Sequence, residues 1–314
     1  MSAVLALAGG VGGAKLILGL SRLLSPEDLS VVVNTGDDEE FYGLHVSPDL
    51  DTVMYTMAGI SNPETGWGIT GESFRTLERL RAYGADGWFN LGDLDFATHI
   101  MRTQMLSKGK TLSEVSDVLC SALGVDYAIS PMTDGRLRTL VGTEEGEMSF
   151  QEYFVKNHCD PKVEYLKFDG ADDCHPSPVF QDALVSADAI VFCPSNPFLS
   201  VDPILAIPTV RELIKGFMGI RIAVSPIVGG QAIKGPAAKM LEELGHDVSA
   251  LGVARRYKDL CDLFVIDTKD SDLVADIDLL GMKAYVTDTV MVDENDKIKL
   301  AEYVLDICNL ERGK

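Results

Sequence analysis

Glycine fills four of the five positions from Gly9 to Gly13, and Lys15 follows closely. The segment lies between apolar runs at 3–8 and 16–20, a pattern that predicts a buried strand, a turn and the start of a helix. The N–H groups of such a turn lie at the positive end of the helix dipole, where a phosphate group binds well. Glycines also let an anion approach the backbone closely. The predicted phosphate-binding residues are Gly9, Gly10, Gly12, Gly13 and Lys15.

This loop differs from two common nucleotide-binding motifs. A Walker A motif requires Ser or Thr directly after its Lys, whereas Leu16 follows Lys15 here. A dinucleotide-binding motif has its third glycine where this chain has Lys15. The sequence therefore disfavours an ordinary ATPase and an NAD-linked oxidoreductase. A tight strand-to-helix turn without a ligand is the simpler alternative.

Polar residues follow the strand predicted at 30–34, and paired carboxylates come before two predicted helices. Asp49 and Asp51 precede a helix expected at 51–60, and Asp93 and Asp95 precede one expected at 96–108. Clustered oxygen ligands suit Mg²⁺, which usually binds one or two carboxylates together with phosphate oxygens and water. Asp51 or Asp95 alone could simply cap its helix. The strand-end residues are Asn34, Thr35, Asp37 and Asp38, and the predicted metal ligands are Asp37, Asp38, Asp49 and Asp93.

Two later loops also follow predicted strands. Ser195 and Asn196 lie between two prolines after the strand at 189–193. Gly229 and Gly230 follow the strand at 221–225 and lead into a helix, as the first glycine loop does. Ligands of parallel α/β sheets bind beyond the carboxyl ends of the strands, so these loops are expected at the same cleft.

The composition limits the classes of protein that this chain can represent. Its 314 residues are 46% hydrophobic and 24% charged, which is typical of a globular protein with a sizeable core. The net charge of −21 disfavours binding to nucleic acid or to an anionic membrane. No apolar stretch approaches the roughly 18 residues of a membrane span, and no signal peptide is predicted. The six cysteines have no framework spacing, which favours a cytoplasmic protein.

Strands and helices alternate at both ends of the chain, which predicts a Rossmann-like, doubly wound, mainly parallel sheet in three α/β/α layers. Between these ends the periodicity is mostly helical. The predicted core is 1–60 plus 163–314, and the predicted inserted, mostly helical subdomain is 61–162. Besides the strands named above, strands are expected at 163–168, 263–266 and 284–287. Helices are expected at 12–24, 73–83, 111–123, 150–155, 178–186, 203–215, 235–244, 249–257, 271–279 and 298–309.

Taken in order, the polar loops resemble the motif set of the 2-phospho-L-lactate transferase family, and the resemblance covers nearly the whole chain. The motifs that carry it are residues 8–16, 33–38, 48–53, 91–93 with 97–99, 194–197 and 225–230. Segments 66–69 and 91–93 favour the transferase branch of the family over a related branch with the same fold and no such activity.

The resemblance implies a role in making the deazaflavin coenzyme F420. Members join a phospholactyl group, taken from lactyl-2-diphospho-5′-guanosine, to the deazaflavin alcohol Fo, with Mg²⁺ present and GMP released. Carried over to this sequence, the Fo contacts fall on Asp51 and Asn90, where relatives often have a basic residue at the second position. The resemblance also implies a homodimer. Whether the donor carries lactate or its enolpyruvyl relative stays open.

Within this hypothesis Asp51 orients the attacking hydroxyl of Fo and is the candidate to accept its proton. The first glycine loop holds the diphosphate, bridged by Mg²⁺, and positioning and charge neutralisation dominate the catalysis. The loops with Ser195, Asn196, Gly229 and Gly230 hold the guanosine or the lactyl carboxylate. The alternative is a regulatory protein of the same fold that binds a nucleotide-linked metabolite without turnover.

Overall fold

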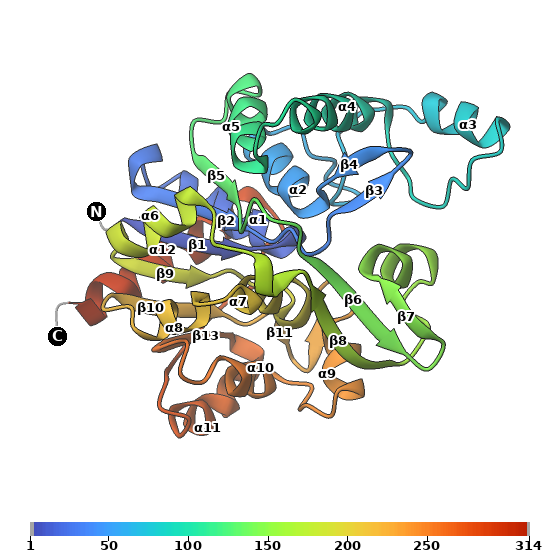
Figure 1. Ribbon diagram of the computed structural model, residues 1–314. Helices are drawn as coiled ribbons and strands as arrows, with labels where there is room; N and C mark the ends of the chain where they lie inside the picture. Colours follow the sequence, from blue (N-terminus) through green and yellow to red (C-terminus); the bar gives the residue numbers. More distant parts are fainter. Residues whose placement is uncertain (1–2, 313–314) are drawn as a thin grey trace.

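Seven parallel strands form the central sheet of the structure, a computed structural model that describes residues 3–312 (Figure 1). Their order across the sheet is β14-β13-β10-β9-β1-β2-β5, and every neighbouring pair is parallel. The predicted doubly wound α/β fold is therefore confirmed. The strands are β1 (Val4–Ala8), β2 (Leu29–Val33), β5 (Ala128–Pro131), β9 (Ala189–Phe192), β10 (Ile220–Val224), β13 (Leu263–Asp267) and β14 (Lys283–Thr287).

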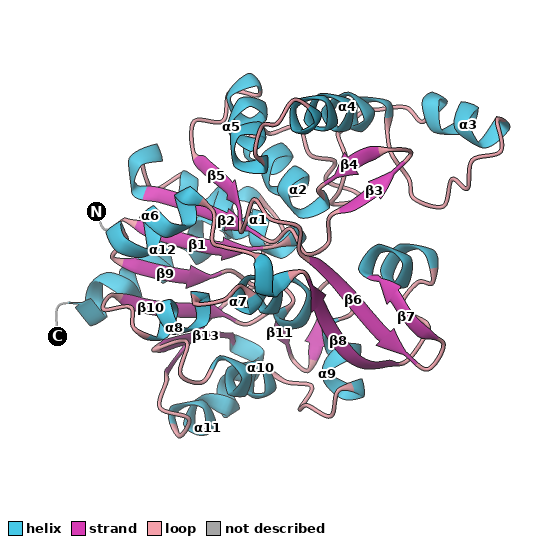
Figure 2. Ribbon diagram, in the orientation of Figure 1, coloured by secondary structure: helices cyan, strands magenta, loops and turns pink. Residues whose placement is uncertain are grey.

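Apolar side chains cover both faces of this sheet, as expected for parallel strands buried between helices. In β1, Leu5 and Leu7 belong to one hydrophobic cluster, whereas Val4, Ala6 and Ala8 belong to the other. Helices accordingly lie on both sides of the sheet (Figure 2). The first cluster includes residues of α6 (Pro178–Ser186), α7 (Asp202–Ala206), α8 (Val210–Lys215), α9 (Ala237–Glu243), α10 (Ala250–Tyr257) and α11 (Val274–Asp278). The second includes residues of α1 (Gly10–Ser21), α2 (Pro48–Met57), α5 (Leu112–Ala122) and α12 (Glu294–Arg312).

Smaller elements lie beyond the carboxyl ends of the central strands. A three-stranded antiparallel sheet has the order β7-β6-β8, and it extends away from the central sheet in Figure 1. Its strands are β6 (Arg138–Thr143), β7 (Gly146–Ser149) and β8 (Val163–Asp169). The other elements are α3 (Arg75–Ala82), α4 (Asp93–Ser107) and the hairpins β3 (Glu39–Phe41) with β4 (Leu44–Val46) and β11 (Ile227–Val228) with β12 (Gln231–Ala232).

Two strands belong to a different sheet from the one that the predicted division into core and insertion implies. β5, within the segment 61–162, forms an edge of the central sheet beside β2, and such an edge tolerates Pro131. β8, expected in the central sheet, pairs with β6 in the small sheet instead. Glu164 and Lys167 are exposed there, which a central parallel strand buried on both faces would not allow. The predicted placement of 163–168 was therefore wrong.

Most predicted helices are present with ends shifted by a few residues. The helix predicted at 203–215 is divided into α7 and α8 at Pro208, because proline cannot donate the hydrogen bond of a helix interior. The segment predicted as a helix at 150–155 contains a π-helix, η2 (Glu152–Lys156), and a second π-helix, η4 (Pro197–Val201), precedes α7. Among residues 3–312, no helix is both long and apolar enough to cross a membrane.

Candidate active site

A cavity of about 650 Å³ opens where the chain changes direction in the central sheet, beside the loops that follow β1 and β9. This is the switch point at which parallel α/β sheets bind ligands. The cavity brings together residues from most of the predicted loops. The predicted site residues that line it are Gly9, Gly10, Gly12, Lys15, Asp37, Asp49, Asp51, Asn90, Ser195 and Asn196.

The loops after β1 and β9 are joined by Ser195. Its Oγ donates to the carbonyl oxygen of Gly9 over 2.7 Å and accepts from the Gly9 N–H over 3.2 Å. A Cβ at Gly12 would overlap the carbonyl oxygen of Pro194, and a Cβ at Gly13 would lie 2.8 Å from both Ala8 Cβ and Ser195 Oγ. Close packing of the two loops therefore explains much of the glycine content. Gly13 does not line the cavity.

Asn34 and Asp49 connect the loop after β2 with the first turn of α2. Asn34 Nδ2 donates to Asp49 Oδ2 over 2.9 Å and to the carbonyl oxygen of Leu199 over 3.1 Å. Asn34 itself lies behind the cavity wall, as does Thr35. Burial raises the pKa of Asp49 to about 7, although the Asn34 hydrogen bond opposes the shift. A carboxylate thus stands beside Gly9 and Gly10, where sequence reasoning placed the phosphate group.

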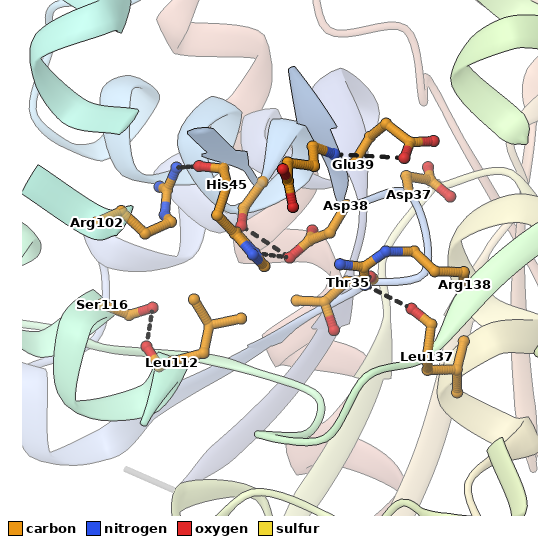
Figure 3. A network of polar contacts seen from close by, with 12 residues as sticks. Thr35, Asp37, Asp38, Glu39, His45, Arg102, Leu112, Ser116, Leu137 and Arg138 are labelled. Atoms are coloured by element: carbon orange, nitrogen blue, oxygen red, sulfur yellow. Dashed lines mark hydrogen bonds and ion pairs between the residues drawn. The ribbon is translucent and has the colours of Figure 1, made fainter. Parts of the chain in front are cut away.

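Asp37 and Asp38 follow β2, and each has one buried carboxylate oxygen, Oδ1, with no hydrogen-bond partner. The other oxygen of Asp38 accepts from Ser47 Oγ over 2.8 Å and lies 2.9 Å from His45 Nε2 (Figure 3). Burial and then the charge of Asp49 raise the pKa of Asp37 well above its usual range. Asp37 lines the cavity and Asp38 does not. In residues 3–312, no group of three or more His, Cys, Asp or Glu side chains is arranged to hold a metal ion.

Asp51 lies on the cavity wall, where it forms an ion pair with the buried Arg102 of α4. Arg102 Nη1 donates to one carboxylate oxygen over 3.1 Å, and Nη2 donates to the other. Arg102 also contacts His99 Nδ1 at 3.1 Å. It donates to the carbonyl oxygen of His45, as Figure 3 shows. Burial lowers the pKa of His99 to about 4, so this side chain is neutral where it lines the cavity. Asp51 therefore presents a fixed, charge-paired carboxylate.

Asp95 is a second carboxyl on the same wall, and our sequence analysis did not select it. It lies in the first turn of α4, is 5% exposed and lines the cavity. The cap that we considered for this residue is absent, because α4 begins at Asp93 with Gly92 as its N-cap. The sequence did carry a signal for this. Asp95 lies four residues before His99, a spacing that places both side chains on the same face of a helix, together with Phe96.

Two lysines line the cavity on the side of α1. Lys15 Nζ donates to the carbonyl oxygen of Met291 over 2.7 Å, and burial lowers its pKa, assisted by Lys297 and Lys234. Lys234 Nζ donates to the carbonyl oxygen of Thr65 over 2.9 Å. The two ammonium groups provide positive charge opposite the carboxylates.

Three predicted site residues lie elsewhere. The Asp93 carboxylate is exposed and binds Ser73 Oγ and the N–H of Thr76 at the start of α3, so it is separate from the other carboxylates. Gly229 donates its N–H to Asp270, and neither Gly229 nor Gly230 lines the cavity. The residues just after them, 233–237, do line it. The predicted loop thus contributes residues 233–237 to the cavity wall, rather than its two glycines.

Aromatic side chains surround the outer part of the cavity. Phe150 and Phe154 stack with ring centroids 5.3 Å apart, and Phe89, Trp67 and Tyr55 also line the space. Phe154 lies on the π-helix η2 and Leu199 on the π-helix η4, an irregularity that is frequent at functional sites.

Asn90 at the cavity rim accepts a hydrogen bond from Arg81 Nη2 over 3.1 Å. A cation therefore lies beside Asn90 at the cavity rim.

The fold and cavity define a Rossmann-like protein with a small-molecule site at the switch point of its sheet. Residues 4–303 match the family model described as 2-phospho-L-lactate transferase CofD, so the chain belongs to this family, which acts in coenzyme F420 biosynthesis, and is a transferase enzyme.

Several relatives match along their whole length. A phosphoenolpyruvate transferase of Streptomyces griseus is 42% identical over 316 residues, which cover 99% of each chain. A 2-phospho-L-lactate transferase of Methanopyrus kandleri is 39% identical over 306 residues, which cover 96% of each chain. The crystal structure of a UPF0052 family member from Bacillus halodurans has the same fold, with a TM-score of 0.62, 15% identity and coverage of 97% of this chain and 98% of that one.

Proposed function

We propose that the protein transfers the 2-phospho-L-lactyl group of lactyl-2-diphospho-5′-guanosine to the terminal ribityl hydroxyl of Fo and releases GMP. The observation that carries this proposal is the division of one cavity into two chemically different parts. Backbone amides and lysines, with carboxylates that can hold Mg²⁺, suit a diphosphate ester, and the aromatic rim suits a flat heteroaromatic ring. The full-length similarity to relatives named 2-phospho-L-lactate transferase supports the same reaction.

The donor diphosphate would occupy the part of the cavity next to the first turn of α1, with Lys15 and Lys234 adding positive charge. Asp49 stands there too, so its negative charge must be neutralised when the donor binds. We propose that Asp37 and Asp49, with Asp38 behind them, hold Mg²⁺, because the unpartnered oxygens of Asp37 and Asp38 suit a hard cation. Mg²⁺ supplies charge neutralisation at the diphosphate when it is bound.

The deazaflavin ring would lie among the aromatic residues, with its ribityl chain directed toward Asp51. The paired carboxylate of Asp51 can accept a hydrogen bond from a hydroxyl while Arg102 fixes its orientation. Asn90, supported by Arg81, would contact the ring at the rim. These residues position the acceptor, which is the main task in a phosphoryl transfer.

A second candidate donor carries an enolpyruvyl group in place of the lactyl group. Four Streptomyces and Kitasatospora relatives, 39–42% identical, are named phosphoenolpyruvate transferases. The two donors would use the same diphosphate and deazaflavin contacts, so the difference concerns only the acyl carbons.

The proposal is tested by incubating the purified protein with Fo, Mg²⁺ and each donor in turn. Mass spectrometry should detect the phospholactyl–Fo adduct, and chromatography should detect an equal amount of GMP. A product from the enolpyruvyl donor alone would favour the second candidate. Binding of a nucleotide-linked ligand with no product from either donor would favour the regulatory alternative. Light scattering tests the implied homodimer, and the cytoplasmic location stays a prediction.

A further inference from the structure

The cavity wall formed by α2 and α4 carries two carboxyls in different electrostatic settings. Both oxygens of Asp51 accept from Arg102. No Lys, Arg or His within residues 3–312 forms an ion pair with Asp95. Asp51 is therefore paired with a cation, whereas Asp95 is buried without one. This difference suits two different tasks.

Contacts with Glu72 and with the segment around Gly68 define the position of Asp95. Its N–H lies 3.4 Å from Glu72 Oε2, and Glu72 Oε1 accepts from the N–H of Ile69 over 2.8 Å. A Cβ added at Gly68 would lie 3.5 Å from Asp95 Oδ2. The Asp95 carboxyl thus lies beneath the segment that carries Trp67 and faces the cavity that Trp67 and Gly68 also line.

The charged and titratable neighbours of Asp95 come from three segments. Asp51 and Tyr55 face it from α2, Glu72 faces it from the residues before α3, and His99 lies one turn further along α4. Burial first, then the charges of Glu72 and Asp51, raise the pKa of Asp95 to about 7. A carboxyl in such surroundings can take up and release a proton near neutral pH.

We propose that Asp95 accepts the proton of the attacking hydroxyl, and that Asp51, fixed by Arg102, orients that hydroxyl without taking the proton. This inference rests on the proposed function. In the step, the hydroxyl oxygen of Fo forms a bond to the lactyl-side phosphorus, and the bond from that phosphorus to the oxygen of GMP breaks. The hydroxyl proton passes to Asp95, and GMP leaves with the bonding electron pair. The acid form of Asp95 then returns the proton to water.

The test is the isosteric variant Asp95→Asn in the full-length protein, compared with Asp51→Asn. For Asp95→Asn we expect kcat to fall by about 100-fold or more, and the rise of kcat with pH through about 7 to disappear. The Fo dissociation constant, measured by deazaflavin fluorescence, should change less than about threefold. Asp51→Asn should instead weaken Fo binding and keep the pH-dependent rise. Asp117→Asn, on the exposed face of α5, is the matched control.

The opposite result would overturn the proposal. If Asp51→Asn loses the pH-dependent rise and Asp95→Asn keeps it, the proton goes to Asp51. An infrared titration of the ligand-free protein provides a readout that needs no turnover. The absorption of protonated carboxyl groups at pH 6 should be smaller in Asp95→Asn than in the wild type, and an equal absorption would refute the inference. Wild-type turnover separately decides the proposed function.

Discussion

The two halves of the cavity are built in different ways. The inner half is lined by residues of the loops after β1, β2 and β9 and of the first turn of α2, namely Gly9, Gly10, Gly12, Asp37, Asp49, Asp51 and Ser195. Backbone atoms meet there without space for a methyl group, as at Gly12 and Pro194. The outer half consists of residues 65–68, 89–91, 150–158 and 233–236, and it is joined mostly by side chains. The Lys234 hydrogen bond to Thr65 is one example.

Under the proposed function this difference separates two tasks. A reaction at a diphosphate needs groups fixed to fractions of an ångström, which interlocked backbone provides. Recognition of a large aromatic acceptor needs area and shape, which aromatic side chains provide. The ion pair of Asp51 with Arg102 joins the inner half to α4, the helix that follows the outer segment 89–91.

Removing the Asp51–Arg102 ion pair should produce the largest change in the free energy of unfolding. In Arg102→Met the buried Asp51 carboxylate loses its cation, and we expect the free energy of unfolding to fall by about 3–5 kcal/mol. Urea unfolding measures the loss. The double variant Asp51→Asn with Arg102→Met removes the uncompensated charge and should regain more than half of it. If the free energy of unfolding of Arg102→Met lies within 1 kcal/mol of the wild-type value, the ion pair is dispensable for stability.

The next test compares a glycine of the inner half with a glycine that closely follows the outer segment 65–68. Gly12→Ala places a methyl group against the Pro194 carbonyl oxygen, so the two loops must separate, and we expect a loss of about 2–4 kcal/mol. Gly71→Ala, near the outer half, meets no atom within 4 Å and has only the strain of its φ of +72° to overcome. That strain costs roughly 1–2 kcal/mol. Thermal unfolding of both variants measures the difference, and equal losses would contradict the contrast between the halves.

The inner half could largely be predicted from the sequence, because its residues are close to strand ends and local signals mark those ends. Gly9, Asp49, Asp51 and Ser195 all line one cavity as this reasoning implies. The same reasoning misjudged why the glycines are there. Gly12 packs against Pro194 and Gly13 against Ser195, each 182 residues further along the chain, and no local pattern shows such a tertiary contact.

The outer half could not be predicted in the same way. Trp67, Phe89 and Phe154 come from three separate segments, and the last of these follows β7 of the small sheet, whose strand β8 was predicted in the central sheet. Asp93 and Asp95 have the same side chain and lie two residues apart, yet one caps α3 and the other faces the cavity. Only the orientation of α4 decides between them. The charged residues of β8 were the available signal for its true place.

A smaller effect concerns the charge held in the inner half. The pKa of Asp49 is about 7 in the folded protein and near 3.8 in the unfolded chain, so folding favours its protonated form. Its contribution to stability is present at low pH and is lost as pH rises through about 7. Asp49→Asn keeps an acceptor for Asn34 and carries no charge. At pH 8.5 without metal it should be more stable than the wild type by about 1–3 kcal/mol, and the gain should shrink by pH 5.

Urea unfolding at a series of pH values measures this difference. A gain of the same size at pH 5 and pH 8.5 would mean that the Asp49 carboxyl does not titrate between them. Asp117→Asn, on the exposed face of α5, should show no such pH dependence and serves as the control.

The smallest expected effect is the most specific to the outer half. Lys234→Met removes the hydrogen bond to Thr65, and because this bond is exposed, the free energy of unfolding should change by less than about 1 kcal/mol. Local opening should still increase, because Lys234 connects two segments that otherwise meet mainly through side chains. Hydrogen exchange of the amides at 62–70 should become several-fold faster, while exchange in β1 stays unchanged. Faster exchange in both places would mean that Lys234 stabilises the whole fold, and the two halves would then not be independent.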